Sequence, residues 1–419
     1  MIKTPKSLRL HIAVTGQTNT GKSSFVNYLT GQSVSITSPV PGTTTDVVEK
    51  TAELLPLGPV VFLDTAGTND TSELGQARME KTRKVLDRAD IMCMVIEAER
   101  WSSHEEQLAE QASVRNIPLL IVVNKTDIRD PGKDFIEKLS VYSPHIVCCS
   151  TIDPAGRERT IAAVKNILIE EAPDDYLQPP PLAEDLVPAG GHAVLIVPID
   201  IEAPKGRLIL PQVQTLRALL DAGAAGSVVK EDEYPGFLRR LSTSPDLVIC
   251  DSQVVDQMVR DTPEDVVCTT FSILFARYKG DLAAAARGAA EISKLRSGDR
   301  VLISEACSHH PMEDDIGRVK IPRWIDNYTG ASLDWSVVAG RDYPEDLEQY
   351  KLIIHCGGCM LNRRAMLSRV EQAREAGVPI TNYGVAISTA HGVVERVLEP
   401  FTEALGAYRE AVRETTREA

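Results

Sequence analysis

Two stretches of the sequence place reactive side chains at spacings that suit particular ligands. Residues 16–24, GQTNTGKSS, have the G-x-x-x-x-G-K-S pattern of a phosphate-binding loop, between a β-branched run and a helical pattern. In such a loop, backbone N–H groups and the Lys22 ammonium bind the phosphates, and the Ser23 hydroxyl reaches Mg²⁺. Residues 352–360, LIIHCGGCM, contain two thiols at the spacing of a chelating pair. The chain therefore predicts a nucleotide site near its start and a metal site far from it.

Two further motifs follow the phosphate-binding loop in the order that a nucleotide switch requires. In PGTTTD, Thr44 is the best candidate to bind Mg²⁺ and sense the γ-phosphate, with Thr43 and Thr45 as near equivalents. VVFLDTAG then ends a buried strand with Asp64, placed to bind the metal through water, and with Gly67, whose N–H can meet the γ-phosphate. The residues expected to act in catalysis are Lys22, Thr44 and Gly67.

The choice of base is indicated by LLIVVNKTD, which resembles the guanine-selective loop of GTPases. Its Asp127 carboxylate can accept from both the ring N–H and the exocyclic amine of guanine, which adenine cannot reproduce, so GTP is favoured over ATP. The strand HIVCCST brings two further residues to the base. The expected nucleotide contacts are Gly16, Asn19, Gly21, Lys22, Ser23, Ser24, Thr44, Asp64, Gly67, Asn124, Lys125, Asp127, Ser150 and Thr151.

Two departures from Ras-like proteins bear on hydrolysis. Thr68 follows Gly67 where a water-orienting Gln would stand, so we expect slow turnover. Asn19 resembles the asparagine with which potassium-activated GTPases of the tRNA-modification and ribosome-assembly type hold K⁺, and a carbonyl oxygen suits that hard cation. An equally weighted alternative is that Asn19 only tolerates the turn.

Composition limits the function classes. The 419 residues include 45 Lys and Arg against 59 Asp and Glu, and the net charge of −14 disfavours nucleic-acid binding. No secretion signal and no run near the roughly 18 apolar residues of a membrane span is found, so we expect a cytoplasmic protein with reduced thiols and no membrane contact. Five thiols in or beside apolar runs are expected to be buried: Cys93, Cys148, Cys149, Cys250 and Cys268.

Alternating strand and helix patterns predict an α/β chain of three domains. A P-loop GTP-binding domain is expected over residues 1–172, a proline-rich linker over 173–189, an α/β dimerisation domain over 190–262 and an α/β domain over 263–419, which the resemblance given below identifies as an iron-sulfur cluster domain. In the middle segment, GRLILP is expected to be a strand and QVQTLRALLDAGA a helix. That segment shows no nucleophile paired with a base and no metal spacing, which favours association into a homodimer.

Two candidate ligand groups follow strands in the last third. Cys307 and His309 come after GDRVLISEA, and His355, Cys356 and Cys359 end or follow YKLII. In an open parallel sheet the carboxyl ends of strands share one rim, so both groups can meet there. Three thiolates with His309 or His355 would complete a zinc site, whereas a cubane cluster needs only the three thiolates. Its fourth position would be open to His309, His355, Asp314, water or another molecule, and an unmetallated set of thiols is the plain alternative.

The GTPase motifs, the middle α/β segment and the order C-S-H followed by H-C-G-G-C resemble the FeFe-hydrogenase maturation GTPases, the HydF family. The resemblance covers essentially the whole chain. It implies a 4Fe-4S cluster on the three cysteines, and a scaffold or carrier that delivers the diiron precursor of the hydrogenase active site. Apo FeFe-hydrogenase and the radical-SAM maturases of the same pathway are the implied partners.

Two competing classes remain. One is an RNA-modification or ribosome-assembly type GTPase with a structural zinc site, which the net charge and the lack of an aromatic and basic RNA-binding pattern disfavour. The other is a GTP-dependent interaction protein whose metal is purely structural.

Overall fold

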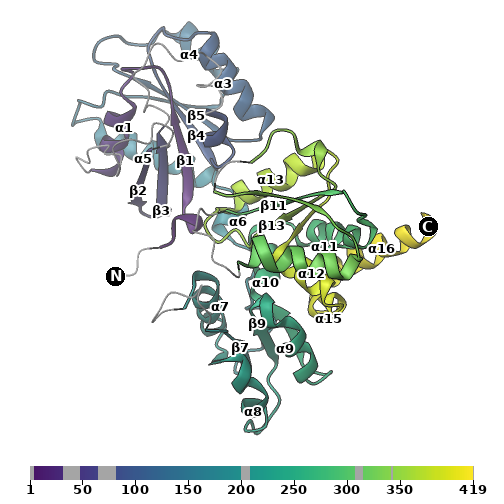
Figure 1. The fold of residues 1–419 in the computed structure, drawn as a ribbon. Helices are drawn as coiled ribbons and strands as arrows, with labels where there is room; N and C mark the ends of the chain where they lie inside the picture. Colours follow the sequence, from purple (N-terminus) through teal and green to yellow (C-terminus); the bar gives the residue numbers. More distant parts are fainter. Residues whose placement is uncertain are drawn as a thin grey trace. The chain divides into compact units, whose positions relative to one another are not determined.

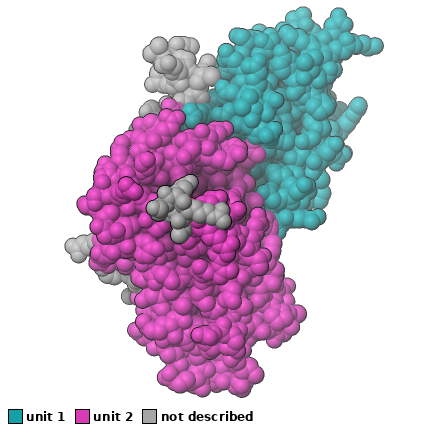
Figure 2. All heavy atoms as spheres, turned by 90° about the vertical axis from the view of Figure 1, so that its right-hand side faces the viewer, with its two compact units in different colours: residues 1–179 teal, residues 180–419 magenta. Residues whose placement is uncertain are grey.

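The computed structural model describes residues 4–31, 48–64, 82–199, 208–306, 315–340 and 343–418. The chain divides into two compact units, residues 1–179 and 180–419, which Figure 2 shows in different colours. Both units are built mainly from parallel strands alternating with helices, which confirms the predicted α/β class (Figure 1).

The first unit is a six-stranded sheet of order β2-β3-β1-β4-β5-β6, in which only β2 runs antiparallel to its neighbour. Helices cover both faces: Phe25 of α1 and Val164 of α5 lie in one core cluster, and Leu108 of α3 and Phe135 of α4 lie in the other. Because both faces are covered, the central strands read as continuous apolar runs. The elements are η1 Lys6–Leu8, β1 Leu10–Thr15, α1 Lys22–Thr30, β2 Val48–Leu54, β3 Gly58–Asp64, β4 Ile91–Glu97, α3 Ser103–Val114, β5 Leu119–Asn124, α4 Lys133–Ser140, β6 His145–Cys148, α5 Arg157–Glu170 and α6 Asp174–Leu177.

The second unit contains two four-stranded parallel sheets. The first, called here the middle sheet, has the order β10-β9-β7-β8. Its elements are β7 His192–Ile196, α7 Leu210–Asp221, β8 Ala225–Val229, η2 Glu231–Glu233, α8 Tyr234–Leu238, β9 Leu247–Cys250, η3 Ser252–Val254, α9 Val255–Asp261, β10 Val267–Thr270 and α10 Phe271–Lys279. The boundary expected between residues 262 and 263 falls before β10, and β10 pairs with β9, so this sheet extends to Thr270.

The C-terminal sheet has the order β12-β11-β13-β14. Its elements and the helices around it are α11 Leu282–Ala290, η4 Glu291–Lys294, β11 Arg300–Ser304, the π-helical turn η5 Ile316–Lys320, α12 Ile321–Thr329, β12 Asp334–Val338, η6 Leu347–Gln349, β13 Leu352–His355, α13 Arg363–Glu375, β14 Ile380–Asn382, α14 Tyr383–Ala390, α15 Val394–Leu398 and α16 Thr402–Glu418. One hydrophobic core continues from Leu182 through both sheets to Ala404.

The middle and C-terminal sheets have the same topology, with β7, β8, β9 and β10 equivalent to β11, β12, β13 and β14. Backbone hydrogen bonds at the strand ends also match. The N–H of Asp251 donates to Ile196 O at 3.2 Å, and the N–H of Cys356 donates to Ser304 O at 2.9 Å. Asp251 after β9 therefore occupies the position that Cys356 occupies after β13.

Two expectations about local structure are wrong. GRLILP is no strand in its described part, because α7 begins at Leu210 and Pro211, in the first helical turn, has a preset φ that suits a helix start. Among the five thiols expected to be buried, Cys148 is exposed. It ends the edge strand β6, and successive strand residues point to opposite sides, so the neighbouring Cys149 is buried instead.

Candidate functional site

The phosphate-binding loop turns from β1 into α1 through backbone geometry that needs glycine at two places. Gly16 has a φ of +130°, and a Cβ there would lie 2.1 Å from Val95 O. Gly21 has a φ of +95°, and a Cβ there would lie 2.3 Å from Asn124 Nδ2. At both positions the positive φ and the close neighbouring atom exclude a side chain, so the fold of the loop itself requires the two glycines.

Lys22 is buried at the start of α1, and its Nζ donates to Gly16 O at 2.8 Å and Gln17 O at 2.7 Å. Helix α1 has no side-chain cap at its N-cap, Gly21, so the first N–H groups of the helix are not capped by a side chain. Ser23 is half-buried and Ser24 is exposed. A helix N-terminus with an adjacent lysine is a site for phosphate oxygens.

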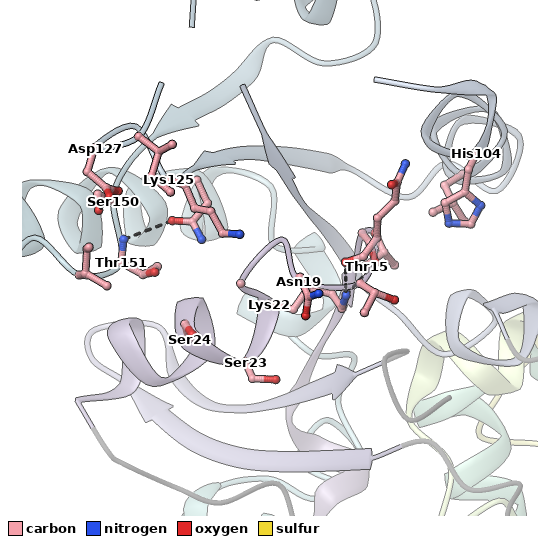
Figure 3. Close-up of a pocket in the computed structure, with 18 of the residues that line it drawn as sticks. Thr15, Asn19, Lys22, Ser23, Ser24, His104, Lys125, Asp127, Ser150 and Thr151 are labelled. Carbon is pink, nitrogen blue, oxygen red and sulfur yellow. Dashed lines mark hydrogen bonds between the residues drawn. The ribbon is translucent and has the colours of Figure 1, made fainter. Parts of the chain in front are cut away.

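Most of the predicted nucleotide residues that the structure describes line one cavity of about 920 Å³, and Asp64 is not part of its lining. Figure 3 shows Asp127, Ser150 and Thr151 at one end of it and His104 at the other, with Lys22 and Asn19 between them. The predicted residues in its lining are Gly16, Asn19, Gly21, Lys22, Ser23, Ser24, Asn124, Lys125, Asp127, Ser150 and Thr151. Asn19 is exposed in the loop with a φ of +67°.

Asn124 links the phosphate end of this cavity to the base end. Its Nδ2 donates to Thr20 O at 2.9 Å, and its Oδ1 accepts from the N–H of Thr151 at 3.2 Å. Asp127 is exposed and accepts from the Ser150 hydroxyl, while the Lys125 ammonium pairs with Glu97. The Asp127 side chain, expected to read guanine, is therefore held by Ser150, which follows the neighbouring strand β6.

The switch residues are described only in part. Asp64 ends β3, is half-buried and pairs in register with Val14, near the end of β1. The end of β3 therefore lies beside the end of β1, the strand that leads into the phosphate-binding loop. Thr43, Thr44, Thr45, Gly67 and Thr68 lie outside the described residues, so their expected roles stay predictions.

Residues that the motifs did not identify also shape the cavity. Gln17 Nε2 donates to Glu105 Oε2 at 3.1 Å and to Ser102 Oγ at 3.2 Å, and His104 lines the same cavity. Ser102 and Glu105 form a capping box at the start of α3. The S-x-x-E pattern of that box is visible in the sequence and predicts a helix start, although not its position beside the phosphate-binding loop.

The second candidate site is the thiol loop, residues 356–361, which connects β13 to α13. Cys356 and Cys359 are both half-buried, and Cys356 Sγ accepts from the N–H of Ala306 at 3.1 Å. Gly358 has a φ of +59°, and a Cβ there would lie 2.3 Å from Met366 Cε. The loop therefore needs glycine at this position, and it carries both cysteines just beyond the carboxyl end of β13.

His355, a predicted ligand, is buried in β13 with both ring nitrogens hydrogen-bonded. Nε2 lies 2.9 Å from Arg369 Nη1, and Nδ1 lies 2.7 Å from Cys356 O. Arg369 has no acceptor, so Nε2 accepts and Nδ1–H donates. Burial, with the neighbouring guanidinium, lowers the pKa of His355 to about 3. Metal binding through either nitrogen would have to displace one of these bonds.

The other predicted metal ligands, Cys307, His309 and Asp314, lie outside the described residues. Ala306, the last described residue before them, donates its N–H to Cys356 Sγ and therefore lies beside the thiol loop. Within the described ranges, no group of three or more His, Cys, Asp or Glu side chains is placed to hold a metal ion. The complete ligand set therefore stays a prediction.

In the described part of the chain, no helix is long and apolar enough to cross a membrane.

Curated relatives match the first unit. The chain is 35% identical over 156 residues to the tRNA modification GTPase MnmE of Prochlorococcus marinus (strain NATL2A), covering 36% of this chain and 33% of that protein. It is 39% identical over 125 residues to MnmE of Synechococcus sp. (strain JA-3-3Ab), covering 29% and 26%. The chain thus spans about a third or less of these relatives.

Similar solved structures are the G domain of the T. maritima FeoB iron transporter and an Aquifex aeolicus Era variant bound to GDP·AlF4⁻. The first is 18% identical with a TM-score of 0.31, covering 39% of this chain and 98% of that chain. The second is 19% identical with a TM-score of 0.31, covering 88% and 98%.

Family models divide the chain into three segments. Residues 11–125 match the 50S ribosome-binding GTPase model, residues 182–280 the hydrogen maturase F dimerization domain and residues 283–400 the hydrogen maturase F tetramerization domain. The second and third segments contain the middle and C-terminal sheets, and the third includes the thiol loop. With a GTPase domain followed by both maturase domains, the chain belongs to the hydrogen maturase F family of hydrogenase-maturation GTPases.

Proposed function

We propose that this chain hydrolyses GTP in its first unit and holds an iron-sulfur cluster on Cys307, Cys356 and Cys359 in its second. In this proposal it is the scaffold or carrier that assembles or delivers a diiron precursor to apo FeFe-hydrogenase, in a pathway shared with radical-SAM maturases. The observation that carries the proposal is the pair of half-buried thiols at the end of β13, within the domain matched by the maturase model.

The donor set suits a 4Fe-4S cluster. Cys356 Sγ already accepts a backbone N–H from Ala306, a bond that stabilises a thiolate. Cysteine thiolates are the usual ligands of such clusters, and three of them leave one iron with an exchangeable position. A carrier needs such a position and a structural zinc site does not. His355 is a poor fourth ligand because its nitrogens are engaged by Arg369 and Cys356.

Hydrolysis of GTP follows from the residues of the cavity. Lys22 and the first N–H groups of α1 hold the phosphates, Ser23 and Asp64 serve Mg²⁺, and Asp127 reads guanine. We propose that turnover is slow because Thr68 cannot orient water as Gln does, and that K⁺ bound through the exposed Asn19 accelerates it.

Separate inactivation of the two sites tests the function. Lys22→Ala should abolish GTP turnover and keep iron and sulfide, whereas Cys356→Ala combined with Cys359→Ala should lose the cluster and keep turnover. Both should fail to activate apo-hydrogenase in a reconstituted mixture. Activation at the wild-type level by the double cysteine variant would refute the carrier role. Activation at that level by Lys22→Ala would show that GTP hydrolysis is not required for hydrogenase activation.

The similarity of the first unit to tRNA modification GTPases motivates one alternative, an RNA-modification or ribosome-assembly type GTPase, to which a structural zinc site in the second unit would belong. The two proposals differ in the metal. Chain purified under argon should be brown and absorb near 400 nm if the iron-sulfur proposal is correct. A colourless protein with one zinc per chain would favour the alternative.

We also propose that the chain forms homodimers through the segment matched by the dimerization model. Val213 and Leu220 of α7 are exposed, seven residues apart on one helix face, and Val228 is exposed on the edge strand β8. Exposed apolar residues at the edge of a sheet are typical of an interface between subunits.

A further inference from the structure

Lys279, the last residue of α10, lies beneath the thiol loop. Its side chain is buried, at 1% exposure, and its Nζ reaches three backbone carbonyls of the loop. The distances are 3.4 Å to Gly358 O, 3.1 Å to Cys359 O and 3.0 Å to Leu361 O. One side chain from a helix some eighty residues earlier in the chain thus supports the segment that carries both thiols.

The geometry indicates a charged ammonium. A lysine ammonium has three donors and no acceptor, and three carbonyl oxygens surround this one. The ring of Phe275 lies 5.7 Å from Nζ and offers a further favourable contact for a cation.

No carboxylate balances this charge in the described part of the chain, where Lys279 forms no ion pair; its polar partners there are the neutral carbonyls. Burying a cation without a counter-ion is costly, so an anion nearby would offset that cost. The thiols of Cys356 and Cys359 are the groups on which negative charge would develop when metal binds.

A second contact fixes α10 to the thiol loop from the opposite direction. Arg363, the first residue of α13, donates from Nη1 to Tyr278 O at 2.9 Å and to Gly280 O at 3.3 Å. Lys279 therefore points from α10 into the loop while Arg363 points from the end of the loop back to α10. The position of Lys279 against the thiol loop is thus held by contacts to the middle and the end of the loop and by Arg363, just beyond it.

We propose that Lys279 is a positioning residue that holds the thiol loop and supplies a fixed positive charge to the anionic iron-sulfur group on its thiolates. This inference rests on the proposed function, which supplies the anion. The charge stabilises the more negative, reduced state of that group, because opposite charges attract strongly at short range in a low-dielectric interior. Removing the charge should therefore make reduction harder.

The test compares three variants after anaerobic reconstitution with iron and sulfide. Lys279→Gln keeps a donor for the carbonyls and removes the charge, Lys279→Met removes both, and Lys279→Arg keeps the charge. Lys294→Met is the matched control, because Lys294 is a partly exposed cation of the same unit that pairs with Glu291. Iron and sulfide content and the midpoint potential, followed by electron paramagnetic resonance, are measured for each.

We expect Lys279→Gln to retain iron and to be reduced at a more negative potential than the wild type. Lys279→Met should in addition bind less iron, Lys279→Arg should recover part of the shift, and Lys294→Met should match the wild type. A Lys279→Gln chain that either has the wild-type potential or no longer folds, by circular dichroism, would overturn the inference and leave the carrier proposal standing. A wild-type chain that binds no iron would overturn both.

Discussion

The middle sheet and the C-terminal sheet present different residues at equivalent strand ends. Strand β9 ends in Cys250, with Asp251 following it, whereas β13 ends in His355, with Cys356 following it. Asp251 caps the short helix η3 by accepting from the N–H of Gln253 at 3.1 Å, while Cys356 begins a loop with two glycines. The two sheets thus offer equivalent positions after a central strand. The side chain at that position decides whether it caps a helical turn, as Asp251 does, or is a candidate metal ligand, as Cys356 is.

The cysteines of the middle sheet and those of the C-terminal sheet differ in burial. Cys250 and Cys268 of the middle sheet are buried within strands, and burial raises the pKa of Cys250, and that of Cys268 to about 11. Burial disfavours the thiolate that metal binding requires, so both thiols act as side chains of the core. Cys356 and Cys359 lie after their strand and are half-buried. A cysteine within a strand is thus a buried core residue here, whereas a cysteine in the loop after the strand is a candidate metal ligand.

The largest expected difference between the halves is in bound iron. Cys356→Ala should lower the iron content of reconstituted chain to background, because the ligand set loses a thiolate. Asp251→Ala, at the equivalent position, should leave the iron content unchanged. Iron and acid-labile sulfide are measured per chain, and equal loss in both variants would show that the rim of the middle sheet also takes part.

The edge strands give a second comparison, in oligomeric state. Val228 of β8 and Val337 of β12 are equivalent and similarly exposed, at 41% and 39%. Val228→Lys should shift the dimer toward monomer, since a charge at an apolar interface is costly. Val337→Lys should leave the dimer intact and reduce only larger assemblies. Sedimentation velocity distinguishes the outcomes, and a dimer unaffected by Val228→Lys would exclude β8 from the interface.

Arg369 gives the C-terminal half a buried anchor. It lies 3.3 Å from Ser304 Oγ, 2.9 Å from His355 Nε2 and 3.1 Å from Gly340 O. Arg369→Met leaves buried acceptors without this donor, so we expect a loss of about 1–3 kcal/mol in the free energy of unfolding of the second unit.

Urea unfolding measured by the fluorescence of Trp324 and Trp335 in a Trp101→Phe background reports on that unit, because the chain has 3 Trp. The exposed Arg374→Met is the control and should shift the midpoint little. Similar midpoints for the two variants would show that Arg369 is not an anchor.

The smallest expected difference is between the equivalent helix caps Thr270 and Asn382. Thr270 Oγ1 accepts from the N–H of Ile273, and Asn382 Oδ1 accepts from the N–H of Val385. Replacement by Ala should cost about 1 kcal/mol at Thr270. Asn382→Ala should cost about 1 kcal/mol more, because Asn382 Nδ2 also donates to Ser272 O at 2.8 Å. The same unfolding assay applies, and a larger loss at Thr270 would reverse the expected order.

The sequence alone was sufficient to predict the α/β class, the GTPase motifs and the resemblance to the maturase family. These are patterns of short range: the phosphate-binding loop is a turn of a few residues whose glycines Gly16 and Gly21 are required locally. The thiol pair of Cys356 and Cys359 is likewise set by spacing and by Gly358 between them.

Tertiary structure decided the partners of these motifs, because they come from distant segments. Asn124 bonds Thr20, Arg369 holds the nitrogen of His355 that a metal would need, and Lys279 supports the thiol loop from α10. Burial was also decided at this level, since the exposure of Cys148 depends on β6 being the edge strand. Local spacing specifies which groups can do chemistry, but only packing between separate elements brings them their counter-charges and hydrogen-bond partners.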